Sequence, residues 1–189
     1  MPSLLPPVLT GLPAQQPALT ADGLQLRPWE DGDAPGVKAA YDDPAIQRWH
    51  VERLDDDEAA AYAQKWRELW RTGVRAGWAV VRDDVLIGRV TLVRLDVWQG
   101  QAEVTYWVVP AARGGDVAPR AVQAVTKWAF DLGFHRLELG HSTANQSSCR
   151  VAEKCGFRLE GTRRAQGLHA DGWHDMHLHA RLADDVLPP

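Results

Sequence analysis

The chain has 189 residues, of which 45% are hydrophobic and 24% are charged, and its formal net charge is −4. That length suits one domain with a substantial core, and the composition is typical of a globular protein. No apolar run approaches the roughly 20 residues that cross a membrane, and the acidic balance disfavours a nucleic-acid partner. Residues 1–20 lack the basic start and long apolar segment of a signal peptide. The protein is therefore expected to be cytoplasmic, with neither a membrane nor a nucleic acid as its partner.

The sequence divides into a proline-rich N-terminal arm over residues 1–20, one domain over 21–184 and a short tail over 185–189. Its two cysteines, Cys149 and Cys155, fall on one predicted helix. Six residues of helix place the two side chains on nearly opposite sides, which argues against a disulfide between them. Both are interpreted as small apolar residues of the core.

The first part of the domain predicts one strand and two helices. Residues 24–27 alternate as a short strand does, and a helix is expected from Asp31 to about Tyr41. Asp55 followed by Glu58 forms a capping-box pattern, which predicts the start of a second helix. Apolar side chains then recur at helical spacing, so this helix has one buried face.

The remaining elements follow from alternation, helical spacing and stop signals. The helix after Asp116 repeats apolar side chains at i, i+3 and i+4 and stops at Gly133. The other expected elements are a hairpin of residues 78–82 and 85–95, strands over 102–109, 136–141, from Phe157 and over 174–182, and a helix over 145–155 that ends at Gly156. This order predicts an α/β domain with a central mixed, mostly antiparallel twisted sheet of about seven strands, flanked by about four helices.

The segment from Ala102 to Ala118 carries the candidate chemistry. Its strand stops at Pro110 and turns through an Arg-Gly-Gly loop into the long helix. A glycine-bearing loop at a helix start presents unpaired backbone N–H groups, which favour a phosphate. Glu103 lies among apolar strand neighbours, where burial raises the pKa of a carboxylate toward that of a useful general base. The alternative is that Glu103 is an edge carboxylate that faces solvent beside Gln101.

Four segments in this order resemble the GNAT superfamily of acyl-CoA-dependent N-acyltransferases: AEVTYWVVP, ARGGDVAPRAV, NQSSCRVAEKCGFRLEG and DGWHDMHLHARL. The resemblance covers roughly residues 21–184 and is closest to the Rim-type branch, which includes ribosomal-protein N-terminal acetyltransferases. It implies a single GNAT-like domain that uses acetyl-CoA (coenzyme A) as co-substrate, with no metal. The implied reaction is direct attack by a primary amine, either a protein N-terminus or a small molecule. Branch members often form homodimers.

The resemblance also implies roles for individual residues. Glu103 matches a strand glutamate that serves as the base, and Ser148 matches a serine suspected of protonating the departing thiolate. Asn145 matches an asparagine that contacts the cofactor arm. Arg150 either reaches the cofactor or, as an exposed helix residue, serves solubility. The pantetheine arm is expected along Trp107, Val108 and Val109, and the pyrophosphate on the loop of Arg113, Gly114, Gly115, Asp116, Val117 and Ala118. The backbone amide near Val108 or Val109 would stabilise the oxyanion.

Two positions depart from the family pattern. Asp116 stands where the loop normally has glycine, and it is expected to be an N-cap whose carboxylate competes with pyrophosphate for the same amides. Ala152 stands at the position of the usual tyrosine acid. Either Ser148 takes that role, or the thiolate leaves unaided, since a thiol of pKa near 8.5 is a tolerable leaving group. The alternative functions are a catalytically quiet acyl-CoA-binding domain and an acyltransferase that uses a different acyl-CoA.

Histidines and tryptophans are the other conspicuous residues. His174, Asp175, His177 and His179 resemble a metal cluster, but i, i+2 histidines rarely close a site alone and no cysteine lies nearby in sequence, so no metal is expected. His141 and Ser142 follow a central strand, which favours substrate contact. The helical and strand patterns place Trp66, Trp70, Trp78 and Trp128 in the core, and leave Trp29, Trp49, Trp98 and Trp173 near loops as candidates for an acceptor pocket.

Overall fold

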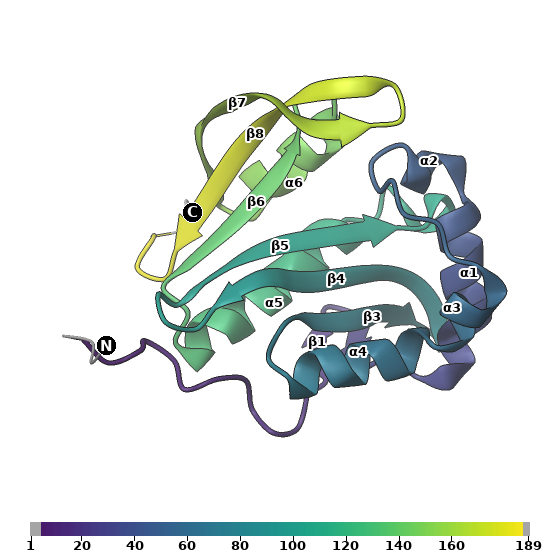
Figure 1. Cartoon of the computed structure of the whole chain (residues 1–189), viewed down its shortest axis with the longest axis horizontal. Helices are drawn as coiled ribbons and strands as arrows, with labels where there is room; N and C mark the ends of the chain where they lie inside the picture. Colours follow the sequence, from purple (N-terminus) through teal and green to yellow (C-terminus); the bar gives the residue numbers. More distant parts are fainter. Residues whose placement is uncertain (1–4, 187–189) are drawn as a thin grey trace.

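The computed structural model describes residues 5–186, which form one mixed sheet with helices on both faces (Figure 1). The strand order is β1-β2-β3-β4-β5-β6-β8-β7. The strands are β1 (Leu19–Ala21), β2 (Leu24–Arg27), β3 (Ala76–Arg82), β4 (Val85–Asp96), β5 (Gln101–Val108), β6 (Arg136–Ser142), β7 (Arg158–His169) and β8 (Gly172–Leu182). The helices are α1 (Ala34–Asp42), α2 (Pro44–Gln47), α3 (Asp56–Ala60), α4 (Tyr62–Arg71), α5 (Val117–Leu132) and α6 (Gln146–Lys154), with 3-10 turns η1 (Asp31–Asp33) and η2 (Pro110–Ala112). The expected α/β class and mostly antiparallel sheet are confirmed.

The structure divides the predicted elements more finely than the sequence pattern did. A three-residue strand, β1, pairs with β2, and the helix that starts after Asp55 is interrupted at Ala61. The capping box itself is formed as predicted: the N–H of Glu58 donates to Asp55 Oδ1 at 2.8 Å, and the N–H of Asp55 donates to Glu58 Oε2 at 3.0 Å. Periodicity identified the buried face but not the break, because the apolar spacing continues across it.

Alternating side chains of the strands enter two separate cores. Val80 packs in the core under α5 and α6, whereas its neighbour Val81 packs in the core under α1, α2 and α4. Successive strand side chains point to opposite faces, so a sheet covered on both faces needs apolar residues at consecutive positions. None of the helices within residues 5–186 combines the length and the apolar character that crossing a membrane requires.

The described part of the N-terminal arm packs against the domain. Leu9 is 6% exposed, and its N–H donates to the Val97 carbonyl at 3.0 Å. Two core tryptophans also hold the arm, since Trp70 Nε1 donates to the carbonyl of Pro13 at 2.9 Å and Trp78 Nε1 donates to that of Pro17 at 2.8 Å. The arm therefore satisfies indole N–H groups that the core alone would leave buried and unpaired.

The sheet opens between β5 and β6. These parallel strands pair only from Gln101 opposite Arg136 to Glu103 opposite Glu138, and then diverge, as Figure 1 shows. Beyond that point β6 continues beside β8, while β5 stays paired with β4 as far as Val108. The backbone groups on the open edge of β5 consequently lack a strand partner, and this opening positions the candidate site.

Candidate active site

Two adjoining pockets occupy the opening between β5 and β6. One, of about 420 Å³, extends past Glu103 and Arg89, and the other, of about 350 Å³, extends along the start of α5 and the outer side of α6. The two share lining residues Trp49, His50, Tyr106, Asn145 and Ser148. A molecule lying across these shared residues would reach both pockets.

The loop before α5 presents a run of free backbone donors. Gly114 and Asp116 adopt left-handed conformations with φ of 86° and 51°, and α5 begins directly after Asp116. In the part of the chain that the structure describes, the amides of residues 114–118 have no hydrogen-bond acceptor. Arg120 fixes the loop from behind, because its guanidinium donates to the carbonyls of Gly115 and Asp116. Amides in such a nest at a helix start bind anions, so the loop fits a diphosphate.

The prediction that the Asp116 carboxylate competes with pyrophosphate for the loop amides is wrong. Asp116 is the N-cap by position, but its side chain accepts no hydrogen bond from the first turn of α5. Its Oδ1 instead lies 2.7 Å from Nζ of Lys154, at the end of α6. The carboxylate therefore leaves the amides free. The left-handed conformation at Asp116 also gives a reason for glycine at this position in the family pattern, since glycine adopts it without steric cost.

The open edge of β5 offers fewer groups to a cofactor arm than the sequence suggested. The N–H of Val109 donates to the Ile87 carbonyl at 3.0 Å, so it is not free to stabilise an oxyanion. Trp107 lies opposite Arg89, two residues before Val109, and its backbone therefore also faces β4. Of the three residues from Trp107 to Val109, only Val108 turns its N–H toward the opening. The Val108 carbonyl accepts from Arg113 Nε at 3.1 Å.

The start of α6 forms the opposite wall. Asn145 is 9% exposed, and its Oδ1 caps the helix by accepting from the N–H of Ser148 at 3.1 Å. Ser148 borders both pockets, and Arg150 borders the second, where its guanidinium donates to Ser147 Oγ at 3.3 Å. Asn145 therefore positions the helix end that carries Ser148.

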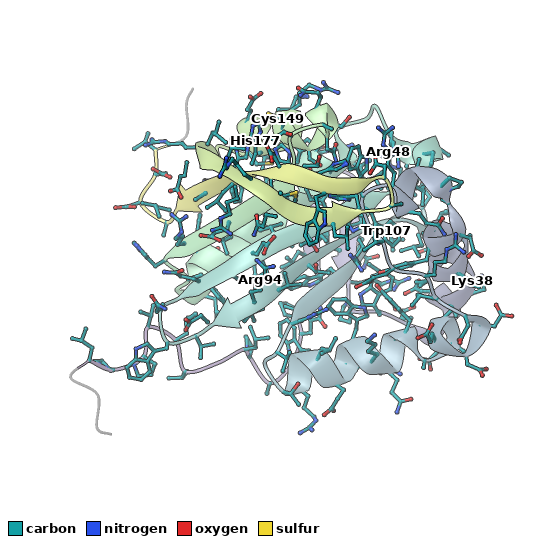
Figure 2. The ribbon with its side chains drawn as sticks, turned by 45° about the horizontal axis from the view of Figure 1, so that its top comes forward. Lys38, Arg48, Arg94, Trp107, Cys149 and His177 are labelled. Atoms are coloured by element: carbon teal, nitrogen blue, oxygen red, sulfur yellow. The ribbon has the colours of Figure 1, made fainter. Side chains whose placement is uncertain are left out.

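Glu103 lies on a central strand and lines the first pocket, so it is not an edge carboxylate. Its side chain is 18% exposed, and its Oε2 pairs with Nη1 of Arg94 at 2.7 Å (Arg94 is labelled in Figure 2). Burial raises the pKa of Glu103, the Arg94 guanidinium opposes this shift, and nearby Glu138 adds to it. Oε1 faces Gly140, where an added Cβ would lie 3.3 Å from that oxygen. Oε2 of Glu103 is thus held by Arg94, and Oε1 faces the opening between β5 and β6.

Three residues that sequence reasoning did not identify also line the site. Arg89 is 7% exposed and donates to the hydroxyls of Tyr41 and Tyr62, with no carboxylate partner among the described residues. The Tyr106 hydroxyl is buried beside Ser148, and burial raises its pKa. His50 Nε2 lies 3.0 Å from the Tyr106 carbonyl, and burial, followed by the charge of Arg89, lowers the pKa of His50 to about 4. Arg89 could have been identified from the sequence, because it is a charged residue within an otherwise apolar strand.

Other residues expected near substrate fall in different places. Trp49 lines both pockets, whereas Trp29 is 2% exposed in the core, and Trp98 and Trp173 are exposed outside both pockets. The core assignments of Trp66, Trp70 and Trp78 are confirmed, and Trp128 packs against the same cluster partly buried. His141 and Ser142 do line the first pocket.

The arrangement is that of an acyl-CoA-dependent acyltransferase fold: a sheet opened between two parallel strands, a loop with free amides at a helix start and a half-buried carboxylate. Residues 24–158 match the acetyltransferase (GNAT) domain family. The chain belongs to this family, as the sequence segments implied.

Two of the named proteins that the chain resembles are ribosomal-protein acetyltransferases. The chain is 27% identical over 117 residues to the ribosomal-protein-serine acetyltransferase of Escherichia coli, covering 61% of this chain and 65% of that protein. It is 36% identical over 105 residues to the probable N-acetyltransferase YjcK of Bacillus subtilis, covering 54% and 58%. The match thus spans less than two thirds of either relative. A structure of RimL, a ribosomal L7/L12 α-N-protein acetyltransferase in complex with coenzyme A, shares the fold with a TM-score of 0.80, at 19% identity over 88% of this chain and 98% of that one.

Proposed function

We propose that the protein transfers an acetyl group from acetyl-CoA to a primary amine, either a protein N-terminus or a small-molecule amine. The opening between β5 and β6 carries this proposal, because it brings free loop amides and a carboxylate of raised pKa into adjoining pockets. The amides of residues 114–118 would hold the diphosphate, and the N–H of Val108 would hold the pantetheine arm.

Glu103 would act as the general base. At pH 7, removing the proton from an α-amine of pKa about 7.7–8 costs about 1 kcal/mol, whereas a lysine of pKa about 10.4 costs about 4.6 kcal/mol. Burial moves the pKa of Glu103 toward that of an α-amine, which makes the transfer easier. The positive charge of Arg89 in the same pocket favours the neutral form of an arriving amine. Both effects lower the cost for either amine, so the α-amine, which starts from the smaller cost, remains the easier substrate.

The departing thiolate would take a proton from Ser148. Ser148 borders both pockets and lies beside the buried hydroxyl of Tyr106. A proton donor at Ser148 therefore lies next to any molecule that spans the two pockets. Ala152, at the position of the usual tyrosine acid, is fully buried, so it contributes no donor.

Three measurements test the proposal. Acetyl-CoA should raise the melting temperature of the protein, and the protein should acetylate at least one member of a panel of peptides and small amines. Glu103→Gln should keep cofactor binding and lower kcat by about 10²–10⁴-fold, the range that general bases contribute. Glu160→Gln is the matched control, because Glu160 also pairs with an arginine, Arg136, but lines neither pocket.

The outcomes separate the alternatives. Binding of acetyl-CoA with no product from the unmodified protein on the whole panel would favour a catalytically quiet acyl-CoA-binding domain. Turnover with another thioester but not with acetyl-CoA would favour a different acyl donor. Absence of binding to every thioester tested would refute the cofactor assignment.

A further inference from the structure

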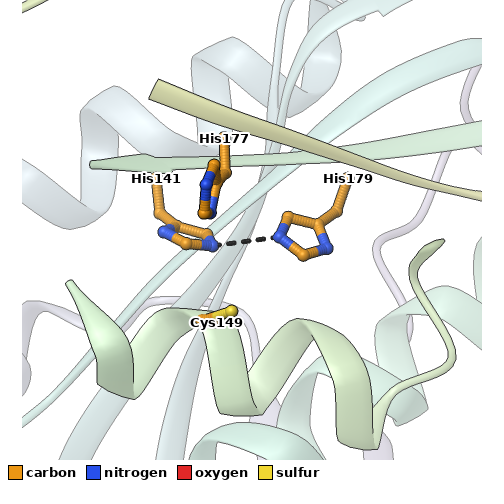
Figure 3. A group of neighbouring side chains, drawn as sticks. All are labelled: His141, Cys149, His177 and His179. Atoms are coloured by element: carbon orange, nitrogen blue, oxygen red, sulfur yellow. Dashed lines mark hydrogen bonds between the residues drawn. The ribbon is translucent and has the colours of Figure 1, made fainter. Parts of the chain in front are cut away.

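We propose that His141, Cys149, His177 and His179 form a binding site for one zinc-type divalent cation. Each residue offers one ligand atom, and these four atoms lie within 4.8 Å of one another (Figure 3). Three imidazole nitrogens and one thiolate are a donor set that zinc takes in tetrahedral geometry. The inference reverses the sequence-based expectation that no metal binds.

The fold brings the four residues together from three elements. In the antiparallel pairing of β6 with β8, His141 lies opposite His177, and His179 lies opposite Leu139, two residues before His141. All three imidazoles therefore project from the same face of the sheet. Helix α6 covers this face and supplies Cys149, and Figure 2 shows Cys149 and His177 close together.

Hydrogen bonds to backbone carbonyls determine which ring nitrogen carries the proton in two of the imidazoles. His141 Nδ1 lies 2.8 Å from the Ser142 carbonyl, and His179 Nδ1 lies 3.3 Å from the Phe157 carbonyl. A carbonyl can only accept, so each Nδ1 carries the proton and each neutral ring has its lone pair on Nε2. A carbonyl on the second nitrogen is also the usual outer partner of a metal-binding histidine.

The Nε2 atoms of His141 and His179 then face each other, and a cation between them would bind both lone pairs. They lie 3.1 Å apart, along the dashed line in Figure 3. A hydrogen bond here would need a proton on one Nε2, whereas with both protons on Nδ1 two lone pairs meet and repel. Zinc–nitrogen bonds of about 2.0–2.1 Å in a tetrahedron place neighbouring nitrogens about 3.3 Å apart. The observed spacing is close to that value, so an ion between the rings would satisfy both lone pairs with little movement.

The other two ligands complete the set. Nδ1 of His177 is buried and has no hydrogen-bond partner among the described residues, which leaves a polar nitrogen for the ion to satisfy. The Cys149 thiol donates to Glu153 Oε1 at 3.5 Å. Metal binding replaces the S–H bond with a sulfur–metal bond, and Glu153 can accept the released proton and pass it to solvent.

Four protein ligands leave no open position on the metal, so the site would be structural rather than catalytic. Its effect would be to fasten α6 to β6 and β8. Asn145 and Ser148 sit at the start of the same helix. An ion bound here would therefore stiffen the wall of the proposed cofactor pocket without touching the reacting atoms, and its binding does not depend on the proposed function.

The test uses the full chain without a histidine tag, stripped with a chelator and free of acetyl-CoA. Zinc should bind at one equivalent per chain in a chelator competition. Cobalt(II) should give visible absorption of a tetrahedral site together with a near-ultraviolet thiolate-to-cobalt charge-transfer band. At a free zinc concentration 100-fold above Kd, the melting temperature should rise by about 5–10 °C. Binding below one equivalent, or cobalt absorption without the charge-transfer band, would overturn the proposal.

Matched variants locate the site. Cys149→Ser should abolish the charge-transfer band, and Cys149→Ser and His177→Gln should each weaken zinc binding by more than the roughly 10–100-fold that loss of an outer partner costs. Cys155→Ala and His135→Gln remove a cysteine and an exposed histidine outside the cluster, and should bind zinc as the unmodified protein does. Zinc binding that Cys149→Ser and His177→Gln leave intact would place the metal elsewhere and refute the assignment. The cobalt spectrum of the unmodified chain tests whether a thiolate binds the metal even where a variant folds poorly.

Discussion

His50 should make the protein less stable as the pH falls below about 6.5. Its side chain is half-buried against the Tyr106 carbonyl in the opening between β5 and β6, and burial, followed by the charge of Arg89, lowers its pKa from 6.5 to about 4. The unfolded chain, in which His50 has its ordinary pKa, therefore takes up a proton at a pH where the folded chain does not. Stability is lost over the window between these two values, and the loss is complete below about pH 4.

The expected size follows from the shift. Each unit of pKa difference corresponds to about 1.4 kcal/mol, so lowering the pH from 6.5 to 5 should cost roughly 2 kcal/mol of unfolding free energy through this group. Urea unfolding at pH 7, 6 and 5 measures the change, and His50→Gln provides the reference, because glutamine can still donate to the Tyr106 carbonyl but does not titrate. The difference in stability between the two proteins should shift by about 2 kcal/mol over this range. A difference that stays constant with pH would show that His50 titrates normally in the folded protein.

Three further substitutions test the geometry of the site. Gly140→Ala should lower kcat about tenfold with little change in melting temperature, because its Cβ would press on Oε1 of Glu103 at 3.3 Å; unchanged turnover would show that this oxygen does not act. Asn145→Ala should cost about 1 kcal/mol in urea unfolding, since it removes the cap of α6, and a neutral result would contradict the capping role. Lys154→Ala should weaken coenzyme A binding several-fold in calorimetry, because it leaves the Asp116 charge unpaired beside the loop amides; affinity equal to that of the unmodified protein would mean that this charge does not reach the diphosphate.

Local signals in the sequence predicted local structure well. The capping box at Asp55, the hairpin turn at Asp83 and Asp84 and the stop at Gly133 all form where they were expected. Each depends on a hydrogen bond or a left-handed backbone conformation within a few residues, so the sequence contains the whole interaction. The Arg-Gly-Gly loop after Pro110 was predicted for the same reason, whereas its bounds at Arg113 and Ala118 came from the family resemblance.

Contacts between distant segments could not be predicted in this way. The direction of the Asp116 carboxylate depends on Lys154, which is far away in sequence but adjacent in space. Trp29 is buried because Tyr62 packs against it at a ring distance of 4.8 Å, although the sequence around Trp29 indicates a loop. Strand alternation did not show which edge of β5 each amide faces, because that depends on its pairing with β4.

The sequence by itself determined the class of domain, its family and the positions of the glycine-bearing loop, the strand glutamate and the capped helix, because periodicity, turn residues and motif order are properties of neighbouring residues. Only the tertiary structure decided which side chains meet. It placed Cys149 of α6 over His141 of β6 and His177 and His179 of β8. The pairing of β6 with β8 and the packing of α6 on them fix that arrangement, and no spacing along the chain contains it.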